Sequence, residues 1–407
     1  MRVETAYNRM LGLPGAWVRD VQFCAEGTVV TVVLRRRRAV CAGCGARRGL
    51  QVHDRRVKRW RHLDLAGGRC IIECELRRVR CAGCRRLALE AVAWARRDTP
   101  YTRDFEDLCA WLAQQISKTQ ITRLLRIGWA SVGTIVARVV AEHLDGDRLD
   151  GLELLGVDEI SHGADHRFLT CVADHATDAI VWAAPGRNAA TLQAFFDALS
   201  DEQKASIQAV SIDMSAGYEK AIRTETDARV CFDPFHVVAL GAHAVDKVRR
   251  AEWNTHGRSG TTQGTWVKGV RWSLLKDPAN QTIRQLAKLH EVQQTNKRMY
   301  RAVLLINELR WLYRIPKDQA PEHLDAWLAW ASRSRLKPFV TLARTLRKHK
   351  TGVLAAIELG LSNGRLEGLN SKVRLLSHRA YGFASADALI ATIYLCCANI
   401  TIALPHR

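Results

Sequence analysis

The sequence lacks the features of a secreted or membrane-anchored protein. Met1 is followed by charged residues such as Arg2 and Glu4, without the basic segment and apolar stretch of a secretory leader. Twelve cysteines in 407 residues are too few for a disulfide scaffold. Residues 388–406 contain no Asp, Glu, Lys or Arg, but polar residues interrupt them, so we expect a buried C-terminal helix rather than a membrane span. We therefore expect a cytoplasmic protein in which paired cysteines bind metal.

Acidic residues are also scarce relative to basic ones. There are 41 Asp or Glu against 61 Lys or Arg, which gives a formal net charge of +20. The net charge is +13 over residues 1–100, −1 over 101–150, −8 over 151–240 and +16 over 241–407. Such basic surfaces favour binding of a polyanion, because contacts with phosphates release counterions. The alternative is that the charge only keeps the protein soluble. The acidic block would repel DNA unless metal ions neutralised it.

Wholesale disorder is excluded by a hydrophobic fraction of 47%, and the length predicts two or three domains. The tetrapeptide Cys-Ala-Gly-Cys occurs twice, with 36 residues between the copies. Two cysteines separated by two residues can bind zinc from one tight turn, and two turns supply four tetrahedral ligands. We expect one structural zinc bound by Cys41, Cys44, Cys81 and Cys84; the alternative is four unrelated buried thiols.

Strands are expected around these cysteine pairs. Residues 21–34 predict a strand pair around Gly27, and a basic, strand-like run precedes each cysteine pair, over 35–38 and 77–80. This arrangement is typical of a zinc ribbon. Cys70 and Cys74 lie on an apolar stretch and are interpreted as core residues, while the sequence leaves open whether they, His53 or His62 take part in zinc binding.

From residue 103 the hydrophobic spacing becomes helical. Apolar residues from Phe105 to Leu112 form one stripe, and Ser117 can cap a short helix over 118–125. After a glycine-containing turn, residues 131–140 predict another helix. This is a helix-turn-helix arrangement, whose second helix enters the major groove of DNA. Any small helical hairpin gives the same pattern. The helix-turn-helix interpretation is supported by the neighbouring basic segment, which carries the expected zinc site.

Residues 152–232 alternate between strand-like and helix-like segments. Strands are expected over 153–158, 167–174, 178–184, 207–213 and 229–232, with helices over 191–199 and 216–223. Three successive strands followed by alternating helix and strand is the order of a ribonuclease-H-like α/β core. Residues 246–355 look all-helical and carry six tryptophans, so we interpret them as an insertion.

The sequence thus predicts a multidomain α+β protein. The expected domains are a zinc-ribbon-like DNA-binding domain over 1–98, a helix-turn-helix over 99–150, the first part of the core over 151–245, the helical insertion over 246–355 and the second part of the core over 356–407.

Carboxylates follow two strands expected to be neighbours. Asp158 ends the first strand of the core and Asp213 ends the fourth, so both should reach one edge of the sheet. Glu367 lies in the first turns of a helix that begins at Asn363 or Gly364. Carboxylates suit Mg²⁺ or Mn²⁺, and two such ions can activate water and stabilise the leaving oxygen of a phosphodiester. Both aspartates could instead be structural caps, and spacing alone does not exclude four competitors, Glu159, Asp165, Asp174 and Asp178.

Several motifs together resemble the ISL-three family of bacterial insertion-sequence transposases. They are GVDEISH, FLTCVADHATDAIVWAAPGRN, SIDMSAGY, CFDPFHVV, AVDKVRR and SNGRLEGLNSKVRLLSHRAYGF, in this order. The resemblance covers nearly the whole chain and implies a DDE transposase whose ribonuclease-H-like core is split by a helical insertion. It implies Asp158, Asp213 and Glu367 as the catalytic triad with two Mg²⁺ or Mn²⁺ ions. The DxxH motif of such cores corresponds to Asp233 and His236, and His236 could equally serve the helix N-terminus.

We therefore expect a transposase that binds double-stranded DNA at the inverted repeats of its own element. It would cleave the ends and join the freed 3′ hydroxyl groups to target DNA, as a homodimer or larger assembly associated with the nucleoid. The alternatives are a DNA-binding regulator and a nuclease of the same fold. The residues expected to contact DNA are Arg35, Arg36, Arg37, Arg38, Arg365, Lys372 and Arg374.

Overall fold

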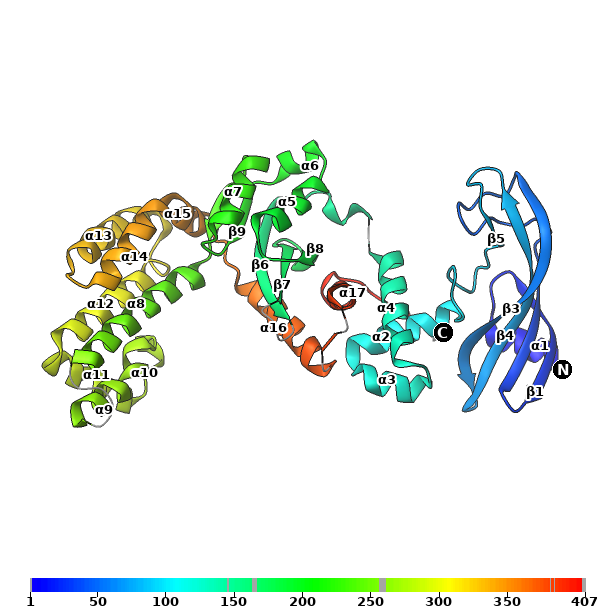
Figure 1. The fold of residues 1–407 in the computed structure, drawn as a ribbon, viewed down its shortest axis with the longest axis horizontal. Helices are drawn as coiled ribbons and strands as arrows, with labels where there is room; N and C mark the ends of the chain where they lie inside the picture. Colours follow the sequence, from blue (N-terminus) through cyan, green and yellow to red (C-terminus); the bar gives the residue numbers. More distant parts are fainter. Residues whose placement is uncertain are drawn as a thin grey trace. The chain divides into compact units, whose positions relative to one another are not determined.

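Figure 1 shows the computed structural model of the chain, which describes residues 2–144, 146–162, 167–255, 261–380, 382–383 and 385–404. The chain divides into two compact units. The first contains residues 1–144 and 394–407, and the second contains residues 145–393. Each unit has its own β-sheet.

The first unit begins with a twisted sheet. Its elements are α1 (Val3–Leu11), β1 (Ala16–Cys24), β2 (Gly27–Leu34), β3 (Leu50–Leu65), β4 (Gly68–Cys81) and β5 (Leu87–Leu89). The strand order is β1-β2-β4-β3, and β5 pairs with β4. Trp60 and Ile72 are fully buried in its core. The strand pair expected around Gly27 is present, and Gly27 has a φ of 124° at the turn between its strands.

The basic run over 77–80 lies in β4, but the run over 35–38 is not a strand. β2 ends at Leu34, so the sequence prediction was wrong for this segment. Arg36 donates a hydrogen bond of 3.2 Å to Glu90, whose side chain is buried, and another to the carbonyl of Ala91. These distant partners draw the segment away from the strand path.

The helix-turn-helix segment follows as α2 (Arg103–Gln115), α3 (Lys118–Leu125) and α4 (Trp129–His143). Ser117 caps α3 in a reciprocal pair of hydrogen bonds with Gln120, as the sequence indicated. α4 begins two residues earlier than expected. The axes of α3 and α4 differ by 102°, which lies within the usual range of a helix-turn-helix.

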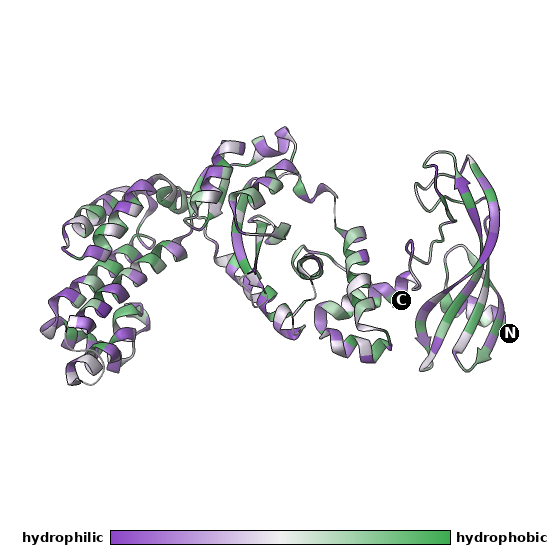
Figure 2. Cartoon of the chain, in the orientation of Figure 1, coloured by the Kyte–Doolittle hydropathy of each residue, from purple (hydrophilic) through white to green (hydrophobic). Residues whose placement is uncertain are grey.

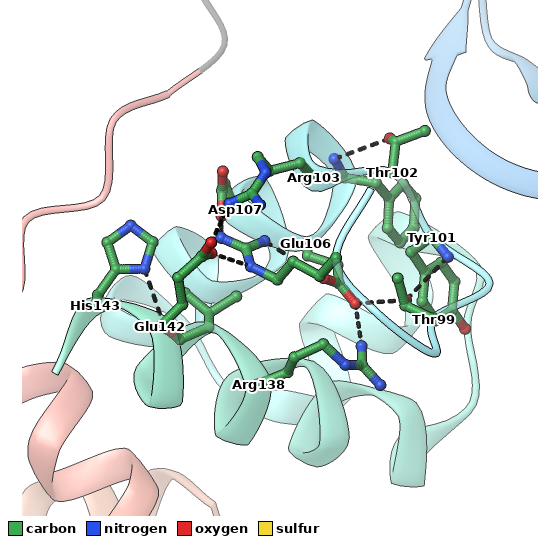
Figure 3. A network of polar contacts seen from close by, with 12 residues as sticks. Thr99, Tyr101, Thr102, Arg103, Glu106, Asp107, Arg138, Glu142 and His143 are labelled. Carbon is green, nitrogen blue, oxygen red and sulfur yellow. Dashed lines mark hydrogen bonds and ion pairs between the residues drawn. The ribbon is translucent and has the colours of Figure 1, made fainter. Parts of the chain in front are cut away.

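Buried charges join α2 to α4 (Figure 3). Glu106 of α2 is fully buried and accepts hydrogen bonds from Thr99 at 2.7 Å and from Arg138 of α4. Arg96 pairs with Glu106, with Asp107 at 2.6 Å and with Glu142 of α4. Because removal of one partner would leave a buried charge uncompensated, this network holds the helices in one arrangement.

The second unit is built on a five-stranded mixed sheet. Its strands are β6 (Leu154–His162), β7 (Arg167–Asp174), β8 (Ala179–Pro185), β9 (Ala209–Ile212) and β10 (Arg229–Phe232). The order is β10-β9-β6-β7-β8, with β6, β7 and β8 antiparallel and β9 and β10 parallel to β6. The accompanying helices are α5 (Ala189–Asp197), α6 (Asp201–Ser206) and α7 (Ala216–Glu225). The sequence did not predict α6.

The remaining described elements of this unit are helical, and the last helix continues past Ile393 into the first unit. They are α8 (Pro234–Thr255), α9 (Thr262–Gly269), α10 (Arg271–Leu275), α11 (Ile283–Thr295), α12 (Lys297–Trp311), α13 (Ala320–Arg333), α14 (Lys337–Lys348), α15 (Lys350–Leu359), α16 (Gly364–Arg379) and α17 (Ala386–Cys397), with short 3₁₀ turns over Gly146–Leu149, Pro278–Asn280 and Lys317–Gln319. In Figure 2 the helices from α8 to α15 carry both green and purple patches along their length, as helices with one buried face do.

The C-terminal helix α17 ends at Cys397, earlier than the uncharged stretch does. Gln114 of α2 donates hydrogen bonds to the carbonyls of Leu395 and Ile400, at 2.7 and 3.2 Å, so residues 395–400 pack within the first unit. Among the described helices, none is long and apolar enough to span a membrane singly; α3 and α4 reach the criterion only together, across their bend.

Candidate functional site

The two Cys-Ala-Gly-Cys turns meet at one end of the strand pair β3–β4. The four Sγ atoms of Cys41, Cys44, Cys81 and Cys84 all lie within 4.8 Å of one another. The Cys41–Cys84 and Cys44–Cys81 distances are both 3.6 Å. Four thiolates about 2.3 Å from one zinc ion in a tetrahedron are roughly 3.8 Å apart, so the cluster fits zinc.

Backbone groups of the first turn favour the thiolate form of Cys41. The N–H groups of Cys44 and Gly43 lower the pKa of Cys41 to about 6 despite its burial. The Gly43 N–H donates to Cys41 Sγ at 3.3 Å. A Cβ at Gly43 would lie only 3.1 Å from Cys84 Sγ, so the glycine leaves room for the cluster.

The other candidate zinc ligands do not join this cluster. Cys70 and Cys74 are buried in the sheet core, where burial raises the pKa of each thiol to about 12. His62 shares a hydrogen bond of 2.9 Å with the hydroxyl of Thr102. His53 lies beside Asp54, 3.7 Å from its carboxylate.

The basic run before Cys41 is divided in its roles. Arg35 donates to the carbonyl of Ala16 at 3.0 Å and lies over the ring of Trp17, and Arg36 binds Glu90. The side chains of Arg37 and Arg38 are exposed. The latter pair is therefore the part of this run that is free for a ligand.

Asp158 and Asp213 lie on adjacent parallel strands. The register pairs Leu154 with Ala209 and Gly156 with Ser211, so Asp158 and Asp213 each lie two residues beyond the last pair of this ladder. Asp213 directly follows β9, as expected. Asp158, in contrast, lies within β6 and not at its end. The strand continues because its other edge stays paired with β7 as far as His162, which the sequence of β6 alone does not reveal.

Both aspartates carry their charge at an energetic cost. Burial raises the pKa of Asp158, and the neighbouring Asp213 carboxylate raises it further. Burial also raises the pKa of Asp213, as does Asp233, whereas His236 lowers the pKa of both. A divalent cation would relieve this cost, and carboxylate oxygens are the ligands that Mg²⁺ and Mn²⁺ prefer. The chemistry of the pair therefore fits a hard cation.

Helix α16 contacts Asp158 directly. Asn370 Nδ2 donates a hydrogen bond of 2.6 Å to Asp158 Oδ2, while the Glu159 N–H donates to Oδ1 at 2.7 Å. Asn363, which precedes α16, donates from its side chain to the carbonyl of Val157 at 3.2 Å. A Cβ at Gly156 would lie 2.5 Å from Leu366, so the glycine permits close approach of this helix.

Glu367 is exposed in the first turn of α16. Counted from Asn363, Glu367 is at position i+4 and Asn370 at i+7, so the three residues lie on one face of the helix. Among the described residues, the four cysteines form the one group of three or more metal-ligating side chains gathered within 4.8 Å. Helix α16, which carries Glu367, is linked to Asp158 through Asn370, but the oxygen atoms of the three carboxylates are not gathered as the sulfur atoms are.

Asp233 connects the helices around the pair. It is buried, and its carboxylate accepts hydrogen bonds from the backbone N–H of Asn363 at 2.8 Å and of His236 at 3.2 Å. Asn363 also accepts from Ser211 of β9 at 2.5 Å, and His175 contacts the same hydroxyl at 2.7 Å. Sequence reasoning assigned Asn363 only a helix start and missed Asn370 and Ser211, because the partners of these residues are remote along the chain.

The four acidic residues that the sequence left as competitors differ in their surroundings. Asp174 binds the backbone N–H groups of Ala176 and Thr177 and so has a structural role. Glu159 is half-buried beside the aspartate pair, and burial raises its pKa. Asp178 lies in a turn with a φ of 56°, and Asp165 lies outside the described residues.

Of the basic residues expected on α16, Lys372 and Arg374 are exposed. The side chain of Arg365 lies outside the described part of the chain.

Comparison with known proteins links these sites to one family. A family model for transposases of the ISL3 type matches residues 155–393. A model for the zinc finger of transposases IS204, IS1001, IS1096 and IS1165 matches residues 37–84, and one for the helix-turn-helix domain of transposase family ISL3 matches residues 90–140.

Full-length relatives point the same way. The transposase for insertion sequence element IS1557 of Mycobacterium tuberculosis is 38% identical, across 100% of this chain and 98% of the relative. The transposase for insertion sequence element IS1001 of Bordetella parapertussis is 31% identical, across 86% of each chain.

Proposed function

Because this chain belongs to the ISL3 family of insertion-sequence transposases, we propose that it binds the terminal inverted repeats of its own element and catalyses their cleavage and transfer to target DNA. Asp158, Asp213 and Glu367 form the catalytic site and hold two Mg²⁺ or Mn²⁺ ions. When bound, these ions polarise the scissile phosphodiester and increase the acidity of the attacking water.

One observation carries this proposal: the parallel pairing of β6 with β9 ends two residues before both Asp158 and Asp213, and α16 is attached to Asp158 through Asn370. The strand order β10-β9-β6-β7-β8 supports a ribonuclease-H-like core, with the helices over 246–355 as its insertion. In this proposal Glu367 completes the site from the face of α16 that carries Asn363 and Asn370.

The chemistry consists of two balanced displacements at phosphorus. In the first, water attacks the phosphodiester, the bond from phosphorus to the 3′ oxygen breaks, and that oxygen takes up a proton. In the second, the freed 3′ hydroxyl attacks a phosphodiester of the target, loses its proton and displaces another 3′ oxygen. Asp158 and Asp213 orient the reacting groups, and Asp233 positions both His236 and α16 without touching the reacting atoms.

DNA binding is the task of the basic surfaces. The helix-turn-helix presents α4 to the major groove, and Arg37, Arg38, Lys372 and Arg374 contact phosphates. Joining two ends requires two active sites, so the active species is a homodimer or larger assembly on DNA.

Asp158→Asn tests the proposal, because it keeps the volume of the side chain and removes its charge. A duplex from the DNA flanking the gene, where imperfect inverted repeats are expected, serves for both gel-shift and cleavage assays with Mg²⁺ and with Mn²⁺. The variant should bind this duplex like wild type and cleave it several orders of magnitude more slowly. Asp318→Asn, at an exposed position of the same unit, is the matched control.

Cleavage near the wild-type rate by Asp158→Asn would remove Asp158 from the site. Binding without cleavage by wild type under either metal would favour the regulator. Cleavage without joining to a target duplex would favour the nuclease.

A further inference from the structure

A basic groove lies within the first unit, between its sheet and the helix-turn-helix. It has a volume of about 430 Å³, and its walls include Arg59, Arg61, Arg69, Tyr101, Arg126 and Gly128. The first three come from β3 and β4, and Arg126 and Gly128 come from the turn between α3 and α4. Both parts of the unit therefore contribute to one concave surface.

The groove is held in shape by contacts between these two parts. The Arg61 N–H donates to the carbonyl of Pro100 at 2.8 Å, and the Thr102 N–H donates to the carbonyl of Arg61 at 2.9 Å. Arg126 binds the carboxylate of Asp64 and the carbonyl of Gly67, the latter at 3.2 Å, in the β3–β4 turn. These bonds tie the helix-turn-helix to the sheet, so the cationic groups are positioned before any ligand arrives.

Arg126 occupies an unusual backbone conformation for its residue type. It ends α3 with a φ of 54°, in the left-handed region where glycine is the usual residue. A side chain with a Cβ atom is strained in this region, because the Cβ comes too close to the following carbonyl oxygen. Arginine at this position places a guanidinium group in the groove, which glycine would not.

Positive charge in the groove exceeds the negative charge that faces it. Arg59 pairs with Glu26 at 3.0 Å and with Glu73 at 3.4 Å. Arg61 and Arg126 share the single carboxylate of Asp64.

Arg69 is exposed and forms no ion pair with any described residue. Burial lowers the pKa of Arg61, and the charges of Arg69 and Arg126 lower it further, so these cations repel one another. An anion bound between them would remove that repulsion.

The start of α4 supplies a second kind of anion donor at the same place. Gly128 precedes this helix of 15 residues, and no side chain caps its first turn. The free N–H groups at a helix N-terminus, together with the helix dipole, attract anions. In a helix-turn-helix the same end of the second helix approaches the bases.

We propose that this groove binds a backbone phosphate of duplex DNA, held by Arg61, Arg69 and Arg126 at the start of α4. The sheet carrying the zinc site and the helix-turn-helix then grip the same duplex, and the phosphate fixes the register of α4 in the major groove. This inference rests on the proposed binding of the element's ends and goes beyond it, because it names the contact that joins the two modules.

Arg69→Gln is the direct test, since this side chain makes no ion pair whose loss would disturb the fold. Arg19→Gln is the matched control, because Arg19 is also exposed but lies on β1, at the opposite edge of the sheet. Binding to the flanking duplex and to a shuffled duplex is measured by fluorescence anisotropy over a salt series.

Loss of one phosphate contact lowers the slope of log K against log salt concentration by about 0.9 and weakens binding to both duplexes by a similar factor, about 3- to 10-fold. Arg19→Gln should leave the slope unchanged. Circular dichroism verifies that each variant is folded.

A wild-type slope and affinity for Arg69→Gln would overturn the groove as a phosphate site. Weakened binding to the flanking duplex alone would overturn it too, because that pattern indicates base recognition. If wild type itself failed to prefer the flanking duplex, end binding would be wrong, whereas the salt slopes of the variants would still decide the groove.

Discussion

The zinc site and the carboxylate site are assembled from the chain in different ways. The zinc site takes four sulfur atoms from two tight turns, which the pairing of Leu50 with Cys81 in β3 and β4 brings together. The carboxylate site takes its groups from β6, β9, α8 and α16, and one of its hydrogen bonds joins residues 212 positions apart. Among the described residues, the four sulfur atoms lie within 4.8 Å of one another, and the three carboxylates form no such group.

The two kinds of assembly relate differently to the stability of the fold. A cluster made by local turns binds its ion tightly and stabilises the fold that surrounds it. A cluster made by remote elements depends on the packing of α16 against β6, so its geometry responds to substitutions that touch no ligand. Four substitutions test this contrast, in order of decreasing effect on stability.

Cys81→Ser should have the largest effect, because it removes one of four ligands from the zinc site. Structural zinc in small domains contributes on the order of 10 kcal/mol, so the zinc content should fall from about one per chain and the sheet module should lose its cooperative unfolding. Metal analysis and calorimetry measure both quantities. Cys24→Ser, at an exposed thiol outside the cluster, is the control. An unchanged zinc content in Cys81→Ser would exclude Cys81 as a ligand.

Asp233→Ala should have the next largest effect. Two backbone N–H groups would lose a charged acceptor, at about 1–3 kcal/mol each, so the free energy of unfolding should fall by about 2–6 kcal/mol. Because Asn363 precedes α16, a shift of that helix should also slow cleavage, by about 100-fold for a displacement near 1 Å.

Asp174→Ala is the control for this substitution, since Asp174 is also a buried aspartate that accepts from two backbone N–H groups. It should lose similar stability but retain cleavage at a temperature where both variants are folded. Equal loss of activity in both variants would show that Asp233 supports the fold and does not position the site.

Gly156→Ala should have a smaller effect on stability but should still disturb the carboxylate site. The added methyl would lie 2.5 Å from Leu366, so α16 must shift or Leu366 must change its rotamer, at about 1–3 kcal/mol. Because Leu366 precedes Glu367, we expect slower cleavage and unchanged DNA binding, measured on one duplex. Unchanged cleavage would show that the position of α16 tolerates this displacement.

Local chemistry decided which elements the sequence could predict. The bounds of α2 and α3 followed from apolar spacing and from the capping by Ser117, and the cysteine cluster followed from spacing within two turns. The strands of the second sheet were predicted from their β-branched segments. Which strands lie next to one another was predicted from the expected strand order.

Remote partners decided the rest. The segment over 35–38 leaves the strand path because Arg36 binds Glu90, 54 positions away. β6 extends past Asp158 because β7 pairs with it, and the roles of Asn370 and Asn363 depend on strands far along the chain. Spacing within a segment contains no information about such pairs, so the catalytic role of the three carboxylates stays a prediction.

Asp158→Asn should have the smallest effect on stability, and its sign should depend on metal. Burial raises the pKa of Asp158 in the folded protein, so the folded state binds more protons than the unfolded state between the ordinary carboxyl pKa and the raised value. Stability therefore falls as the pH rises through that window and stays reduced at neutral pH. The neutral amide avoids this cost, so without divalent metal the variant should unfold about 1–3 °C higher than wild type at pH 7. The gain should disappear below the ordinary carboxyl pKa, where the aspartate is protonated in both states. With excess Mg²⁺ the order should reverse, because only wild type retains the charge that binds the ion and so gains stability from it. Calorimetry of the second unit's transition, with chelator and with Mg²⁺, measures both arms. If Mg²⁺ raised the unfolding temperature of both proteins equally, Asp158 would have no part in holding the ion, and the contrast between the two metal sites would lose its basis.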